Sequence, residues 1–98
     1  MRDTNERVEE IEGYIYENIE ILSGKGISKL DKDISYMLIQ ENIDTIIKLY
    51  NESVDLRQKE DINKKIIVVR EKLFSYLTKV NNWDEEIFEQ YRKLTRFI

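Results

Sequence analysis

The 98-residue sequence contains no cysteine, no histidine and no proline. Without cysteine, no disulfide bond and no thiolate metal site can form. Without histidine, the commonest general base and metal ligand is missing, and no serine has an imidazole to activate it. Without proline, no residue forces a helix to break. We therefore expect a protein that is not an enzyme and that holds no metal and no cofactor.

Long apolar runs are missing as well. No segment approaches the roughly 18 apolar residues that a membrane-spanning helix requires. The first ten residues, MRDTNERVEE, are polar and acidic, unlike a signal peptide or a transit peptide. These observations predict a cytoplasmic protein, and the length fits one domain over residues 1–98.

Charge is abundant and unevenly distributed. Charged residues make up 37% of the chain, and the net charge of -4 argues against a general nucleic-acid binder. Residues 1–22 hold seven acidic and two basic residues, whereas residues 57–98 hold seven acidic and ten basic residues. The C-terminal part is therefore better suited to an anionic surface, although solvated helix faces also explain such a pattern.

The first expected helix covers residues 3–22. Asp3 and Glu6 have the spacing of a capping box, which satisfies free backbone N–H groups at a helix start. Apolar residues then recur every three or four positions, as on one face of a helix. This face comprises Val8, Ile11, Ile15, Ile19 and Leu22. The helix is expected to end before the Ser-Gly-Lys-Gly sequence at 23–26.

Residues 27–56 carry two apolar sets. The first set is Ile27, Leu30, Ile34, Met37 and Leu38, and the second is Ile39, Ile43, Ile46, Ile47, Tyr50 and Val54. On one continuous helix, at about 100° per residue, the two sets would lie nearly opposite each other. We therefore expect a break or strong bend near residues 40–42, with Asn42 as a new N-cap. One helix with partners on both sides is the alternative.

The third expected helix begins at Glu60 or Asp61. It has the longest apolar face, formed by Ile62, Ile66, Val69, Leu73, Tyr76, Leu77 and Val80. The periodicity of this face outweighs the β-branched run at 66–69, which by itself would favour a strand. Lys79 suits the negative end of the helix dipole.

The fourth expected helix follows a short turn. Asn82 is expected to cap it, with Glu85 completing a capping box and Trp83 folding back as a hydrophobic staple. Its inner face comprises Ile87, Tyr91, Leu94 and Ile98, widened by Phe88. Phe97 and Ile98 are unusual for a frayed helix end, so we expect them to dock against another surface.

These elements define an all-α fold. We expect an antiparallel four-helix bundle in up-and-down order, because the connections are short. A short extra helix is expected near residues 28–40, as a consequence of the break near residues 40–42.

The C-terminal two thirds also have a family resemblance. The successive segments are IDTIIKLYNESVDLRQ, INKKIIVVREKLFSYLTKV and NNWDEEIFEQYRKLTRF. The most characteristic stretch is FSYLTKVNNWDEEIFEQYRKLT, with a basic helix end, a short turn, an acidic helix start and a Tyr-x-Lys-Leu segment. Over roughly residues 42–96, the chain resembles the immunity proteins for pediocin-like (class IIa) bacteriocins of low-GC Gram-positive bacteria.

The resemblance implies a function in self-protection. Family members are cytoplasmic helical bundles that recognise a bacteriocin bound to its membrane receptor, the mannose phosphotransferase permease, from the cytoplasmic side. Because the C-terminal half of the family decides which bacteriocin is resisted, the implied partner-binding residues here are Arg92, Lys93, Arg96, Phe97 and Ile98. The resemblance also implies a monomer with weak contact to the inner face of the membrane. The alternative is a small phage- or antitoxin-like regulatory module that binds another protein, with residues 27–38 as a dimer interface or a docking groove.

Overall fold

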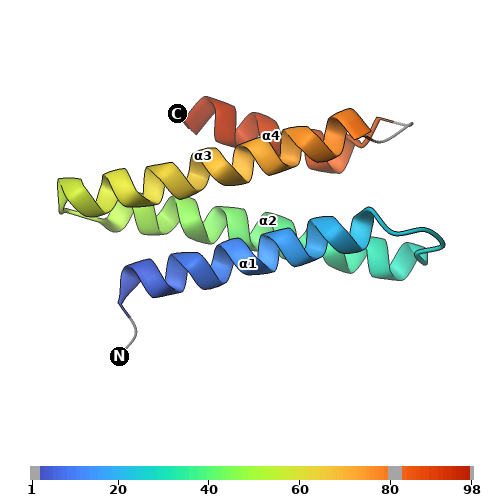
Figure 1. Cartoon of the computed structure of the whole chain (residues 1–98), viewed down its shortest axis with the longest axis horizontal. Coiled ribbons are helices and arrows are strands. Elements are labelled where there is room, and N and C mark those ends of the chain that lie inside the picture. Colours follow the sequence, from blue (N-terminus) through green and yellow to red (C-terminus); the bar gives the residue numbers. More distant parts are fainter. Residues whose placement is uncertain (1–2, 80–82, 98) are drawn as a thin grey trace.

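The computed structural model describes residues 3–79 and 83–97, which form four α-helices (Figure 1). These are α1 (Thr4–Leu22), α2 (Lys29–Glu52), α3 (Leu56–Lys79) and α4 (Glu85–Phe97). Consecutive helices run in opposite directions, and no strand occurs in these two ranges. The expected all-α class and antiparallel four-helix bundle are therefore confirmed.

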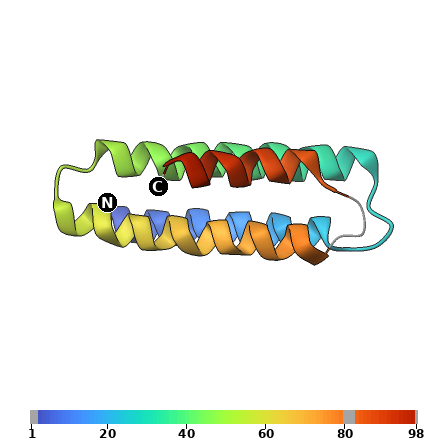
Figure 2. The ribbon, with the colours of Figure 1, turned by 90° about the horizontal axis from the view of Figure 1, so that it is seen from above.

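The bundle consists of two helical hairpins stacked on each other. The α1–α2 hairpin packs against the α3–α4 hairpin, through α1 against α3 and α2 against both α3 and α4. Figure 2 shows α2 beside α4 in one row and α1 beside α3 in the other. Among the described residues, no Cα atom of α1 lies within 8 Å of a Cα atom of α4, so these two helices lie diagonally across the bundle. Because α4 has 13 residues and α2 has 24, α4 covers only part of the length of its neighbour.

The core comes from the apolar faces that the sequence indicates. Its fully buried side chains are Val8, Ile15, Ile39, Ile43, Ile46, Ile62, Ile66, Val69, Leu73, Ile87 and Leu94. All four helices contribute to this set, so each helix is held to the bundle by its own buried face. Burying one such side chain stabilises the fold by about 1.5–3 kcal/mol before the loss of conformational entropy is counted.

Both ends of α1 lie where the sequence predicts them. Asp3 Oδ1 accepts a hydrogen bond of 2.8 Å from the N–H of Glu6, which confirms Asp3 as the N-cap. The helix ends at Leu22, before the Ser-Gly-Lys-Gly turn. Within this turn Gly26 has a φ of 73°, a left-handed conformation that costs other residues about 1–2 kcal/mol.

The expected break in residues 27–56 is wrong. A single helix, α2, runs from Lys29 to Glu52, so there is no separate short helix near residues 28–40. Ser28 caps its start by accepting a hydrogen bond of 3.1 Å from the N–H of Asp31. Asn42 is not a helix cap, because it lies inside α2 and its Nδ2 donates a hydrogen bond of 2.7 Å to the backbone carbonyl of Leu38.

The reason is that only one of the two apolar faces of α2 is buried. Ile39, Ile43 and Ile46 point into the core. Leu30, Ile34 and Met37 remain exposed by 69%, 42% and 51%. The prediction assumed that both faces must be buried, whereas the described part of the chain leaves one of them open.

The third helix begins earlier than expected. α3 starts at Leu56 rather than at Glu60 or Asp61, while its last turn holds Lys79 as predicted. Asp55 organises the start, because its Oδ1 accepts 2.9 Å from the N–H of Arg57. Leu56 is exposed and residues 57–60 are polar, so apolar periodicity cannot detect this first turn. Val80, which the prediction placed on the buried face, lies outside the described residues.

The start of α4 differs from the prediction in its cap. Asn82, the expected cap, lies outside the described residues, and the residue before Glu85 is Asp84. Asp84 Oδ1 accepts a hydrogen bond of 3.3 Å from the backbone N–H of Ile87, which makes Asp84 the N-cap of α4. The staple is confirmed, because the rings of Trp83 and Phe88 lie 4.8 Å apart. These two residues hold the N′ and N4 positions that define this motif.

Candidate functional site

The last turn of α4 docks on α2. The Phe97 ring meets the Tyr50 ring edge-on at a centroid distance of 4.9 Å. Lys59 Nζ lies 4.5 Å from the centre of the same Tyr50 ring. It also donates a hydrogen bond of 3.0 Å to the backbone carbonyl of Tyr50. The expectation that Phe97 docks against another surface is confirmed, and that surface is Tyr50 of the same protein. Ile98 lies outside the described residues.

The basic residues of α4 divide between two directions. Lys93 Nζ lies 2.7 Å from Asp44 Oδ1 of α2, so Lys93 shares with Phe97 the side of α4 that faces α2. Arg92 pairs with Glu89 at 3.3 Å along α4 itself. Arg96, one turn after Arg92, is exposed and has no hydrogen-bond or ion-pair partner within the described ranges. Arg92, Lys93, Arg96 and Phe97, the four implied residues that the structure describes, therefore do not form one open surface.

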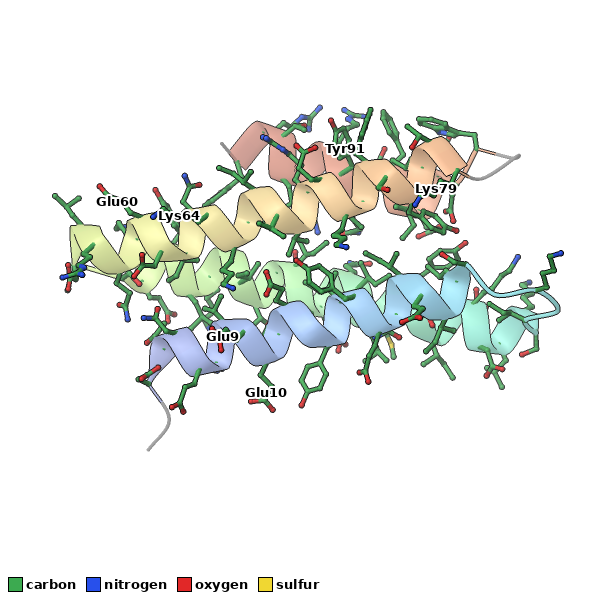
Figure 3. The ribbon with its side chains drawn as sticks, in the orientation of Figure 1. Glu9, Glu10, Glu60, Lys64, Lys79 and Tyr91 are labelled. Carbon is green, nitrogen blue, oxygen red and sulfur yellow. The ribbon has the colours of Figure 1, made fainter. Side chains whose placement is uncertain are left out.

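An aromatic group on the α3–α4 hairpin was missed by the sequence analysis. Phe74 of α3 packs on Tyr91 of α4 at 5.8 Å, and Trp83 packs on Phe88. Phe74 and Trp83 are 48% and 57% exposed, while Phe88 and Tyr91 are half-buried. Figure 3 places Tyr91 where α3 and α4 meet. We call Phe74, Trp83, Phe88 and Tyr91 the aromatic surface.

The sequence contains a weak signal for this surface. Phe74 follows Leu73, which is fully buried, so it belongs to the outer side of α3 rather than to its apolar face. Exposed aromatic rings are enriched at binding interfaces, because they offer large contact areas at low entropic cost. Arg92 follows Phe88 by one turn of α4, so the aromatic surface has a guanidinium at its edge.

Asp84 fixes the geometry of the α3–α4 hairpin. Its Oδ2 accepts hydrogen bonds from the hydroxyls of Tyr36 at 2.9 Å and Tyr76 at 2.7 Å. One carboxylate therefore connects α2, α3 and the start of α4. Burial, reinforced by the hydrogen bond to Asp84, raises the pKa of Tyr36 to about 12 and also raises the pKa of Tyr76.

A second carboxylate connects the two hairpins. Glu12 of α1 pairs with Lys65 of α3 at 3.3 Å and accepts 3.0 Å from the hydroxyl of Tyr16. Burial is the main reason that the pKa of the Tyr16 hydroxyl is raised above its usual range, and the hydrogen bond to Glu12 raises it further. Lys72 Nζ lies 5.4 Å from the centre of the Tyr16 ring. These groups bind one another and hold α1 against α3.

The described residues contain no cluster suited to a metal ion. No group of three or more aspartate, glutamate, histidine or cysteine side chains could hold one within these ranges. In the same part of the chain, no helix combines the length and the apolar character that crossing a membrane requires.

Comparisons with known proteins give no further identification. No protein-family model, no curated protein and no solved structure matches the chain. The interpretation of the site therefore depends on the side chains themselves.

Proposed function

We propose that this protein gives its cell immunity to a pediocin-like bacteriocin, by binding the bacteriocin–receptor complex from the cytoplasmic side. The observation that carries the proposal is the exposure of Phe74 and Trp83 on the α3–α4 hairpin, within the region that resembles the immunity family. Arg92 and Arg96 lie on the same helix as Phe88 and Tyr91. Aromatic rings with arginine at their edge are the side chains that most often anchor protein interfaces.

The proposed mechanism is binding without bond making or breaking. The aromatic surface contacts the complex, and the protein thereby blocks the pore. Arg96, which has no partner among the described residues, is available to an anionic group of the receptor or of the membrane. Each cation near an anionic membrane contributes about 1 kcal/mol, so a few arginines give weak and reversible attachment.

The test is survival of a bacteriocin-sensitive strain that expresses this protein and is challenged with a panel of pediocin-like peptides. We expect protection against at least one peptide. Phe74→Ser and Arg96→Glu should each abolish protection, because both side chains are exposed and neither change opens the core. Lys64→Glu is the matched charge reversal on an exposed part of α3 (Figure 3) and should leave protection intact.

Two outcomes would overturn the proposal. Death under every peptide, with the protein expressed and folded, would remove the immunity function. Full protection by both Phe74→Ser and Arg96→Glu would show that the α3–α4 hairpin does not contact the partner. Circular dichroism of each purified variant separates a failure to fold from a failure to bind.

A second candidate function is favoured by the exposed apolar face of α2. Leu30, Ile34 and Met37 follow one another at helical spacing and are all exposed. A small interaction module that forms a dimer through this face would explain why three large apolar side chains remain outside the core. Light scattering tests this function. A dimer that Met37→Glu converts to a monomer would support it, whereas a monomeric wild-type protein would exclude this dimer.

A further inference from the structure

A groove of about 880 Å³ lies between α1 and α2. Tyr14 of α1 lines both this groove and a smaller hollow next to it, which Glu10 also borders. Figure 3 shows Glu10 projecting from α1 on the side opposite to α3 and α4. The groove therefore opens on the outer side of the α1–α2 hairpin, away from the aromatic surface.

The floor of the groove is apolar. Tyr14 and Ile21 of α1 are 45% and 47% exposed there, and Leu38 of α2 lies half-buried between the helices. Leu30 and Ile34 precede Leu38 at intervals of four, so they extend the apolar track along α2. From Leu30 to Leu38 the track is about 12 Å long, at a rise of 1.5 Å per residue. This length matches about two turns of a helix.

The walls of the groove are acidic. Glu17, Glu20 and Glu41 line it, and none of its lining residues is a lysine or an arginine. Carboxylates that gather around a partly enclosed surface create a negative potential, which attracts a cationic partner.

Two buried or half-buried asparagines add hydrogen-bond acceptors. Asn18 Nδ2 donates 2.7 Å to the carbonyl of Tyr14, and Asn42 Nδ2 donates 2.7 Å to the carbonyl of Leu38. Each amide nitrogen is thus used within its own helix. The amide oxygens of both residues accept no hydrogen bond from the described residues. The residues that line the groove therefore offer carboxylate and amide oxygens, which can accept hydrogen bonds from a partner in place of water.

We propose that this groove binds a cationic amphipathic helix of another protein. The two helices of the hairpin form parallel ridges between which a third helix can lie, as in other helix-in-groove complexes. Its apolar residues cover Tyr14, Ile21 and Leu38, and its lysine and arginine side chains meet Glu17 and Glu41. This binding is separate from the proposed immunity function, which uses the opposite hairpin.

A second copy of this chain fits the groove less well. In a two-fold symmetric dimer, the same surface meets itself. Glu17, Glu20 and Glu41 of one copy would then face the same carboxylates of the other. Like charges brought together at an interface oppose association, so charge complementarity favours a cationic partner over a second copy.

The test uses two synthetic helical peptides of about 16 residues, which form four helical turns. Both carry leucine on one face, and the other face carries lysine in one peptide and glutamate in the other. Calorimetry with the full chain should show binding of the leucine–lysine peptide, weakened by salt, and no binding of the leucine–glutamate peptide. Leu38→Ala should weaken the binding, because it removes apolar contact from the floor.

Paired variants separate the groove from the overall charge. The double variant Glu17→Gln/Glu41→Gln should weaken binding of the leucine–lysine peptide by about tenfold, because both carboxylates line the groove. The control Glu9→Gln/Glu60→Gln removes the same charge at positions that do not line it (Figure 3) and should change binding less than about twofold.

Three results would overturn the inference. Equal weakening by the two double variants would mean that only net charge attracts the peptide. Absence of binding to the leucine–lysine peptide would remove the cationic helix as occupant. A wild-type dimer that Ile21→Lys converts to a monomer would assign the groove to a second copy. None of these results depends on bacteriocin challenge, so the inference and the proposed function fail independently.

Discussion

Replacement of Asp84 by alanine is the sharpest test of how this bundle is held together. The carboxylate of Asp84 accepts three hydrogen bonds: from Tyr36, from Tyr76 and from the backbone N–H of Ile87. It thus joins three helices through one side chain. Asp84→Ala removes all three bonds while leaving the apolar core unchanged.

The expected loss of stability can be estimated bond by bond. Loss of a helix N-cap costs about 1 kcal/mol. A hydrogen bond to a charged group contributes about 1.5–3 kcal/mol, but Tyr36 is only half-buried, so water replaces part of its bond. We therefore expect Asp84→Ala to lower the free energy of unfolding by about 3 kcal/mol, out of the 5–15 kcal/mol typical of a small domain. Asp84→Asn, which can still cap, should lose about half as much.

Urea denaturation followed by circular dichroism and by Trp83 fluorescence measures this change. For a chain of this length, 3 kcal/mol corresponds to a lower melting temperature by roughly 12–24 °C. The contribution of the tyrosine bonds can be isolated with a double-mutant cycle. Tyr76→Phe should cost about 1.5 kcal/mol in the wild-type protein and almost nothing in Asp84→Ala.

The reasoning would be refuted by either of two results. A loss below about 0.5 kcal/mol for Asp84→Ala would mean that the carboxylate acts as an ordinary surface group. An equal cost of Tyr76→Phe in both backgrounds would mean that the two side chains do not interact. Retained helicity of Asp84→Ala at low temperature confirms that the comparison is between folded proteins.

Three further predictions concern the stability of the fold. Gly13→Ala should raise the free energy of unfolding by about 0.5–1 kcal/mol, because a Cβ at this position meets nothing within 4 Å. Gly26→Ala should lower it by about 1 kcal/mol, because Gly26 has a positive φ. Urea midpoints that move in the same direction in both variants would contradict this pair of predictions. Gln90→Met should raise the free energy of unfolding by about 1 kcal/mol, because the buried Gln90 Oε1 has no hydrogen-bond partner among the described residues. Urea denaturation measures this change, and a destabilised variant would show that the amide is needed. Stability should decrease above pH 10, because the raised pKa values of Tyr36 and Tyr76 mean that the folded protein holds these protons more tightly than the unfolded chain does. This stabilisation is complete below pH 10 and is lost as the pH rises towards 12. Urea midpoints that stay constant from pH 9 to 12 would disprove the prediction.

Apolar periodicity predicted most of the fold. The buried faces of α1, α3 and α4 are those that the spacing of isoleucine, leucine and valine indicates, and the caps at Asp3 and the staple at Trp83 follow from local sequence. The error in α2 came from the assumption that every apolar residue has a place in the core. Leu30, Ile34 and Met37 show that a helix can bury one apolar face and expose another.

The candidate sites were less predictable. The aromatic surface depends on how α3 packs against α4, and Asp84 meets Tyr36 only because residues 48 positions apart are brought together by the fold. The groove depends equally on the pairing of α1 with α2. Such contacts arise from the relative placement of helices, which one-dimensional periodicity does not specify.

The short length of α4 has a consequence for local motion. Asp84 anchors the start of this helix, whereas its last turns are held by Phe97 against Tyr50 and by Lys93 against Asp44. Amide hydrogens should therefore exchange with solvent faster in the last turn of α4 than in its middle turns. We therefore expect the last turn of α4 to open before the other three helices separate.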